Sequence, residues 1–422
     1  MQPGVVVLDA DRAAEGERPN TARHATIALR ACGAAAIGQA RSVHSARHLA
    51  SPSDDVAAAL RRRGREVWPL RRRGAALGHA VTVHRRTPTP AEQERLWQRG
   101  EPVFLPGVLG RAPQRFAEAI DATLRMFDRL REHGGGDPTG EVFLDELSAR
   151  LADDPDLVYA GSTVDRNDPR EVERVFVNAE PNGELVAEDL WAKLAWIAHD
   201  ERESSLRIRF SNGLDQLEQW MTTGDLVASW VDQFAQRAFP ECDAVLRCAA
   251  LRERLDALLD RPHRLSERIV YNNAPDGGAA FHHDAEPGQL GVVFSQLEGH
   301  TAWFSLSKRR LAALLERHGY GRRSDVMRAL DDNCDARLLD VCNRDEAFAR
   351  LLAAHGALFV LRAGDSILLP SHGIDDVAWH SVLALGDRPS LAHSYGLFPR
   401  GEQYDPAGDP WLGAAAGGNV RA

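Results

Sequence analysis

A series of short apolar segments between residues 267 and 400 constrains the fold of this chain more than any other feature. The segments are short, rich in β-branched and aromatic residues, and separated by Gly, Pro, Asp and Ser, which favours strands joined by turns. A succession of such strands suits an antiparallel barrel or jelly roll. The segments read "ERIVYNN", "GVVFSQLEG", "HTAWFSLS", "GALFVLRAGDSILLP", "VAWHSVLAL" and "PSLAHSYGLF".

Helical patterns precede and interrupt these strands, so we predict a mainly β core with helices (α+β). A helix is predicted over 24–40, another begins at residue 54 and leads into a basic patch that ends at residue 74, and 75–92 has the "TPTP" of an exposed linker. The predicted parts are a mixed N-terminal segment and linker (1–95), a barrel domain (96–400) with a helical insertion at about 308–355, and a C-terminal tail (401–422).

Composition narrows the classes of function. The 422 residues have room for one large domain with insertions or for two domains, and the net charge of −10 gives no reason to expect nucleic acid as a partner. The five cysteines are scattered without Cys-x-x-Cys spacing, which argues against a zinc ribbon and suits the reducing cytoplasm. We find neither a signal peptide nor an apolar run long enough for a membrane span.

The motif "FHHD" (281–284) supplies candidate metal ligands. Residues i and i+2 of a strand share a face, so His282 and Asp284 would point together while His283 points away. With a histidine from a later strand they would form a 2-His-1-carboxylate triad, which leaves positions open on iron(II). His380, at the start of an apolar strand, is favoured over His372 in a Gly- and Asp-rich loop. The alternative is a buried His–Asp hydrogen-bonded pair without metal.

At these residues the chain resembles a known family. The stretches "FHHDAEPGQLGVVFSQLEGHTAWFSL" and "AGDSILLPSHGIDDVAWHSVLALGDRPSLAHSYGLF" resemble the cupin-like, JmjC-related iron(II)/2-oxoglutarate-dependent oxygenases, and "EPVFLPGVL" resembles the strand that opens their domains. The resemblance spans roughly residues 100–400. It implies a double-stranded β-helix, iron(II), O₂ and 2-oxoglutarate, which is oxidatively decarboxylated to succinate and CO₂. His282, Asp284 and His380 match the iron ligands, and no further catalytic residue is predicted.

The chain departs from the family's pattern where the cosubstrate would bind. The loop "PSHGIDDVAWH" is longer than usual, and Thr301 stands where many members have a lysine that holds the far carboxylate of 2-oxoglutarate. Arg388 with Ser390 resembles the Arg-x-Ser pair of other 2-oxoglutarate oxygenases, and a guanidinium pairs with a carboxylate through two hydrogen bonds. We therefore predict contacts from Arg388, Ser390 and Thr301. The alternative for Arg388 is an exposed arginine in a hairpin turn.

Several functions stay open at this stage. The first is hydroxylation of an unactivated C–H bond in a small molecule, such as an amino acid or a biosynthetic intermediate. The second is the same chemistry on a protein side chain, and the third is a non-oxidative cupin-like metal-binding module or isomerase. The acidic charge and the absence of reader modules favour a small-molecule substrate. The insertion and the segment before residue 100 are candidates for a lid or a homodimer interface.

Overall fold

Two antiparallel sheets dominate the computed structural model of this chain. The larger has nine strands and the smaller has three, and a further three-stranded sheet is formed by residues near the N-terminus. The structure describes residues 7–9, 66–72, 75–83, 87–133, 137–197, 204–212, 224–284, 286, 288–332 and 336–400.

All neighbouring strands of the nine-stranded sheet are antiparallel. Its strands, in spatial order, are β4 (Val103–Leu105), β13 (Ser366–Pro370), β10 (Gly291–Glu298), β15 (Ser390–Pro399), β9 (His263–Asn273), β8 (Leu206–Asn212), β7 (Ala187–Trp196), β6 (Glu171–Ala179) and β5 (Leu157–Thr163). The smaller sheet has the order β12 (Leu358–Arg362), β11 (His300–Ser307) and β14 (Ala378–Leu385).

The segment 277–282 adds a fourth strand to the smaller sheet, beside β14. The amide of Val382 donates to the Ala279 carbonyl at 3.0 Å, and His282 and His380 exchange backbone hydrogen bonds of 3.0 and 2.8 Å. From β9 onward the chain alternates between the two sheets, except that β11 and β12, which are joined by helices, are neighbours within the smaller sheet. This connectivity confirms the predicted jelly roll within an α+β fold.

The barrel interior is filled by apolar and aromatic side chains from both sheets. Phe294 of β10 contacts Trp303 of β11, with ring centroids 4.4 Å apart, and Val382 and Ala392 belong to the same buried cluster. Alternation along β11 sends the neighbouring Phe304 to the opposite face, where it joins a second core. The strands thus bury both faces of the smaller sheet.

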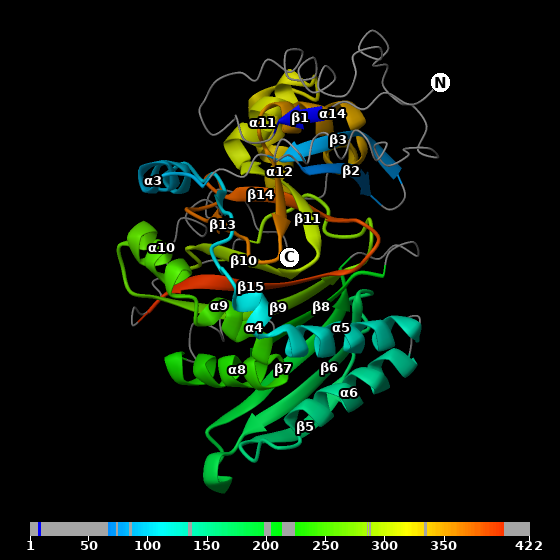
Figure 1. Cartoon of the computed structure of the whole chain (residues 1–422), viewed down its shortest axis with the longest axis vertical. Helices are drawn as coiled ribbons and strands as arrows, with labels where there is room; N and C mark the ends of the chain where they lie inside the picture. The colour runs from blue at the N-terminus through cyan, green and yellow to red at the C-terminus, as the bar shows by residue number, and fades with distance from the viewer. Residues whose placement is uncertain are drawn as a thin grey trace.

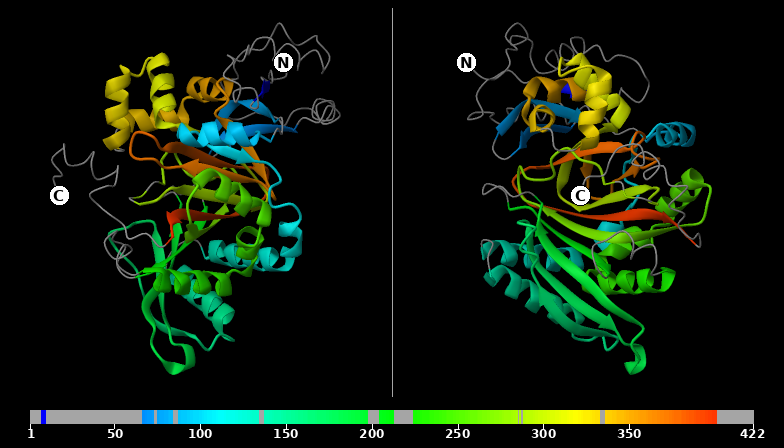
Figure 2. Two further views of the ribbon diagram at one scale, coloured as in Figure 1. Left: turned by 90° about the vertical axis from the view of Figure 1, so that its left-hand side faces the viewer. Right: turned by 180° about the vertical axis from the view of Figure 1, so that it is seen from behind.

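That second core lies between the smaller sheet and four helices that connect β11 to β12. Ser307 begins the first of them as an N-cap, because its hydroxyl accepts from the Arg310 amide. Figures 1 and 2 show these helices at the opposite end of the molecule from β5–β7. They are α11 (Lys308–Arg317), α12 (Arg323–Asp332), α13 (Ala336–Arg344) and α14 (Glu346–Ala354).

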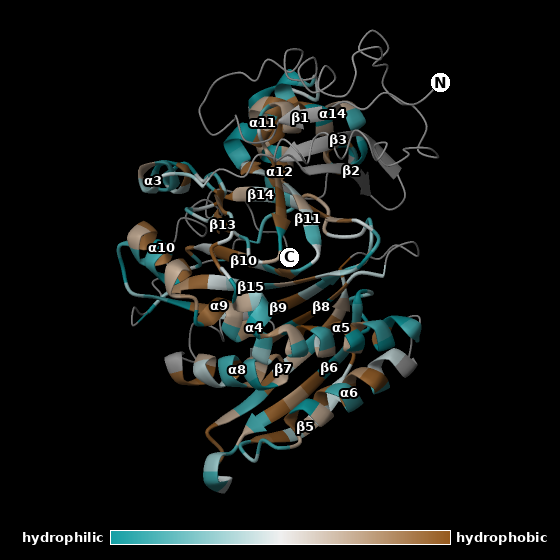
Figure 3. Cartoon of the chain, viewed as in Figure 1, coloured by the Kyte–Doolittle hydropathy of each residue, from teal (hydrophilic) through white to brown (hydrophobic). Residues whose placement is uncertain are grey.

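A third layer of helices covers one face of the strands that extend the large sheet beyond the barrel. On β7, Leu190, Ala192 and Leu194 point into this core, and Trp191 and Lys193 therefore lie on the other face. The main helices of this layer carry brown and teal residues in alternation, as amphipathic helices do (Figure 3). They are α5 (Ala117–Glu132), α6 (Asp137–Leu151) and α8 (Gly224–Ala238).

Short elements complete the described fold. None of the described helices combines the length and the apolar character that a membrane span needs. The short elements are α3 (Pro90–Gln98), α4 (Ala112–Arg115), α9 (Asp243–Leu246), α10 (Ala249–Leu259) and the 3₁₀ turns η3 (Pro181–Gly183) and η4 (Pro240–Cys242).

The region before residue 90 differs from its prediction. Residues of the predicted helix-and-basic-patch segment form β2 (Glu66–Arg72), and half of the predicted linker forms β3 (Ala75–Val83). These strands pair antiparallel, and β1 (Val7–Asp9) pairs with β3. Arginine-rich sequence has no intrinsic preference for strands, so pairing with a partner strand overrides local propensity here. The predicted helix at 24–40 and the tail at 401–422 lie outside the described residues.

Gly278 is required where the segment 277–282 meets β14. Its φ of +142° is unfavourable for other residues, and a Cβ atom there would collide with the Val382 carbonyl. We expect Gly278→Ala to lower the free energy of unfolding by about 3 kcal/mol, through overpacking and backbone strain. Urea denaturation measures this loss. Gly321→Ala is the matched control because its nearest neighbour is 3.9 Å away, and equal stability losses in both variants would contradict the prediction.

Candidate metal centre

Strand pairing brings the three predicted ligands together. His282 and His380 lie directly opposite each other on neighbouring strands, with ring centroids 4.3 Å apart. Asp284 follows His282 by two residues. Its Oδ1 lies 3.1 Å from His282 Nε2 and its Oδ2 lies 3.4 Å from His380 Nε2. One ligand atom from each residue therefore falls within 4.8 Å of the other two.

Contacts around both imidazoles orient their Nε2 atoms toward this site. His282 Nδ1 lies 2.7 Å from the Ala280 carbonyl oxygen, to which it donates, so Nε2 keeps its lone pair for a metal. The His380 ring stacks on Trp303, with centroids 5.1 Å apart and an interplanar angle of 21°. His380 is only 3% exposed, whereas His282 and Asp284 are 33% and 31% exposed, so the site is reachable from one side.

The charges of the site suit metal coordination. Burial alone would raise the pKa of Asp284. The nearby His282 and His380 outweigh burial and hold that pKa well below its usual range. Burial, and then repulsion from His282, lower the pKa of His380 to about 3. Burial also lowers the pKa of His282, but the attraction of its charged form to the Asp284 carboxylate, and the hydrogen bond that this carboxylate accepts from it, outweigh burial and leave that pKa raised. At neutral pH the site thus offers an ionised carboxylate and a neutral His380, the forms that bind metal.

This donor set fits iron(II). Two imidazole nitrogens and one carboxylate make up the facial triad of non-haem iron enzymes. This triad leaves coordination positions of the metal open for other ligands. Within the described part of the chain, these residues are the one group of three or more His, Cys, Asp or Glu side chains close enough to share an ion. A recess of about 10 Å³, room for roughly one water molecule, borders Asp284 and is lined by Gln289, Val292, Leu369, Pro370, Ser371, Val377 and Ala378.

The other two histidines considered in the sequence lie outside the cluster. His283 turns away from the site, and its ring contacts Trp379 edge-on at 5.2 Å. Burial lowers the pKa of His283 to about 4. His372 Nε2 lies 2.8 Å from the Trp97 carbonyl oxygen, and its ring packs edge-on against the Trp97 ring. The structure therefore pairs His380, and not His372, with the His-x-Asp motif.

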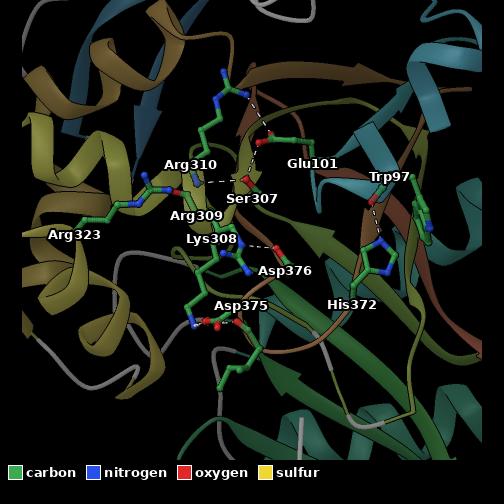
Figure 4. A network of polar contacts seen from close by, with 11 residues as sticks. Trp97, Glu101, Ser307, Lys308, Arg309, Arg310, Arg323, His372, Asp375 and Asp376 are labelled. Carbon is green, nitrogen blue, oxygen red and sulfur yellow. Dashed lines mark hydrogen bonds and ion pairs between the residues drawn. The ribbon is translucent and has the colours of Figure 1, made fainter. Parts of the chain in front are cut away.

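A network of ion pairs holds the long loop that precedes β14 (Figure 4). Lys308, at the start of α11, is 1% exposed and contacts Asp331 of α12, Asp375 at 3.4 Å and the Ile374 carbonyl at 2.9 Å. Arg309 adds a bidentate pair with the next loop residue, Asp376, at 2.6 and 3.0 Å. Because β14 begins directly after this loop, the network also fixes the strand that carries His380.

The residues predicted to hold the cosubstrate lie in different environments. Arg388 is exposed in the turn between β14 and β15, while Ser390 and Thr301 are buried. The Thr301 hydroxyl donates to Gln296 Oε1 at 2.8 Å and accepts from Trp303 Nε1 at 3.1 Å. Thr301 is thus already hydrogen-bonded within the barrel. The roles of all three toward 2-oxoglutarate stay predictions.

Trp303 and Lys308 are the contributors that sequence reasoning missed. Trp303 lies two residues after Thr301, so strand alternation could have placed it on the same inward face. Lys308 is one of only two lysines in the chain, but no local pattern links it to aspartates of a distant helix and loop. Strand alternation could have identified Trp303, whereas the role of Lys308 depends on tertiary contacts.

Comparison with known proteins gives distant structural matches alone, since no family model and no curated protein matches the sequence. SnoN, a non-haem α-ketoglutarate-dependent epimerase from nogalamycin biosynthesis, is 14% identical, with 74% of this chain and 83% of that chain covered and a TM-score of 0.31. A 2OG-Fe(II) oxygenase family oxidoreductase from Burkholderia pseudomallei is 10% identical (75% and 92% covered, TM-score 0.29). HygX from Streptomyces hygroscopicus, solved with nickel and 2-oxoglutarate, is 12% identical (74% and 88% covered, TM-score 0.28). At these values we base the function on the geometry of the site.

Substitution of the two candidate histidines separates their roles. We expect His380→Ala to weaken iron(II) binding strongly, because the substitution removes a metal ligand. The loss of affinity should exceed the roughly 10–100-fold that follows when only a residue hydrogen-bonded to a ligand is removed. His372→Ala, which removes a contact to Trp97, should leave the metal content close to that of the parent protein. Metal analysis after anaerobic loading and desalting gives both values. Loss of iron in His372→Ala with retention in His380→Ala would contradict this assignment.

Removal of the buried ammonium tests the loop network. We expect Lys308→Met to lower the free energy of unfolding by about 2–3 kcal/mol, because Asp331 and Asp375 lose their shared partner. It should also weaken iron binding, since the loop leads into β14. Arg328→Met is the control, because that side chain is 74% exposed and its pair with Asp325 spans 3.9 Å. A Lys308→Met protein as stable as the control would disprove the network's role.

Proposed function

We propose that this protein is an iron(II)- and 2-oxoglutarate-dependent oxygenase that hydroxylates an unactivated C–H bond of a small molecule, such as an amino acid or a biosynthetic intermediate. The observation that carries the proposal is the convergence of His282, Asp284 and His380 on one site in a jelly-roll barrel. When bound, iron(II) with 2-oxoglutarate and O₂ supplies the oxidising chemistry.

The side chains of the site perform three tasks in this proposal. The two imidazoles and the carboxylate would hold the ion and leave positions open for other ligands. Trp303 fixes the His380 ring by stacking. Behind the ligands, the cluster that contains Phe294, Val382 and Ala392 excludes water from the barrel, which protects reactive species from side reactions.

Charge supports a small substrate. The net charge of −10 does not favour a chromatin or nucleic-acid target. The described cysteines Cys242, Cys248 and Cys342 are free thiols, which supports a reducing compartment such as the cytoplasm.

Turnover of the cosubstrate is the first test. We expect purified protein, loaded anaerobically with iron(II), to form succinate from 2-oxoglutarate slowly when O₂ is admitted, even without its substrate. His282→Ala should abolish this reaction because a metal ligand is lost. Succinate is quantified by mass spectrometry, and iron and 2-oxoglutarate binding are measured in the same samples.

The pattern of binding separates the alternatives. Iron binding without 2-oxoglutarate binding or succinate would favour a non-oxidative cupin-like metal-binding module. Binding of neither would contradict the metal centre itself. Hydroxylation of peptides but not of amino acids or other small molecules in a substrate screen would favour a protein side-chain hydroxylase.

A further inference from the structure

Strand β8 carries two arginines on the face that continues the barrel interior. Arg207 lies directly opposite Tyr271 of β9, and Arg209 lies opposite Ile269, so both side chains leave the sheet on the same side as Tyr271. The Tyr271 ring packs against Phe294, with ring centroids 5.8 Å apart. Phe294 in turn contacts Trp303, which stacks on the candidate ligand His380. Figure 1 shows β8 beside β9, on the side away from β10.

The same face of β8 also meets the loop that carries a metal ligand. Arg209 forms an ion pair of 3.6 Å with Glu286, which follows Asp284 by two residues. Arg207 lies within electrostatic reach of Asp284, His282 and Tyr271. The strand pairing places Arg207 on the same face as Arg209, whose ion pair reaches the segment after Asp284, and the charge of Arg207 acts on Asp284 and His282.

Arg207 differs from Arg209 in its contacts to the described residues. It is partly buried, yet among the described residues it takes part in no hydrogen bond or ion pair, whereas Arg209 pairs with Glu286. A guanidinium withdrawn from water without a partner costs free energy that a bound carboxylate would recover through two charge-assisted hydrogen bonds.

The residues predicted from the sequence are less suited to hold a distal carboxylate. Thr301 stands at the position of the family's lysine and is hydrogen-bonded to Gln296 and Trp303. Arg388 is exposed in a turn.

We propose that Arg207 binds the distal carboxylate of 2-oxoglutarate, from a strand outside the barrel, beside Tyr271. This inference rests on the proposed function. It assigns to β8 the role that the sequence suggested for the turn before β15. Tyr271, whose ring packs against Phe294, would form the wall against which the cosubstrate chain lies.

Two keto acids isolate the distal carboxylate in a binding experiment. 2-Oxovalerate keeps the chelating end of 2-oxoglutarate but has a methyl group in place of the distal carboxylate. Calorimetry on iron(II)-loaded protein without O₂ measures both dissociation constants, and their ratio reports the preference for that carboxylate. We expect Arg207→Ala and Arg207→Gln to lower this preference about 10–100-fold, with 2-oxovalerate binding and iron content unchanged. Arg207→Lys should keep part of it, because its charge remains.

The matched control is Arg328→Ala, an exposed arginine of α12 that should retain the full preference, and Arg388→Ala tests the competing position in the turn. Loss of the preference in Arg388→Ala together with its retention in Arg207→Ala would overturn the proposal in favour of the turn arginine. Retention in both variants would also overturn it, and would leave Arg207 free to bind an anionic substrate. Failure of iron-loaded parent protein to bind either keto acid would instead refute the proposed function, which is a different result from a selective loss in one variant.

Discussion

The candidate site depends on one strand pairing, that between the segment 277–282 and β14. The exchange of backbone hydrogen bonds between His282 and His380 sets their side chains opposite each other, and the two-residue period of a strand then brings Asp284 to the same face. A shift of register by one residue would turn His282 away and bring His283 toward the site. The Gly278 conformation and the packing of both faces of β14 oppose such a shift, since each face is buried in a different core.

The helical insertion supports this pairing from outside the barrel. Its helices cover the outer face of the smaller sheet, and Lys308 links its first two helices to the loop before β14. Burial of an ammonium is costly unless carboxylates and carbonyls surround it, and here Asp331, Asp375 and the Ile374 carbonyl do so. The arrangement defines one position for the loop, because any other position would leave the buried charge without partners. The length of the loop, unusual for the family that the motifs resemble, is therefore compatible with a well-placed His380.

Local pattern was sufficient for the parts of this protein that repeat with a period of two. The strands after residue 267 follow from short apolar segments bounded by turn residues, the shared face of His282 and Asp284 follows from alternation, and the preference for His380 over His372 followed from the apolar strand after it. Strands β2 and β3 were not predicted, because the arginines around β2 mask its strand character and the pairing of the two strands is a tertiary event. Thr301 was placed by correspondence with a family, but its hydrogen bonds come from Gln296 and Trp303, whose positions depend on how the strands close. The place of Arg207 depends on the register between β8 and β9, which spans more than sixty residues of chain.

Trp303 explains why a cation outside the barrel is physically reasonable in this chain. Its indole stacks on His380, packs against Phe294 and donates to Thr301, so a large side chain occupies the inward face of β11 near the position of the family's lysine. A lysine introduced there would need both space and a counter-charge inside an apolar cluster, and burial without that counter-charge is expensive. The β8 side of the site has neither obstacle, because Arg207 is only partly buried and Asp284 remains about one-third exposed. Closure of the β11 side by an aromatic residue and provision of charge from β8 are thus complementary features of one site.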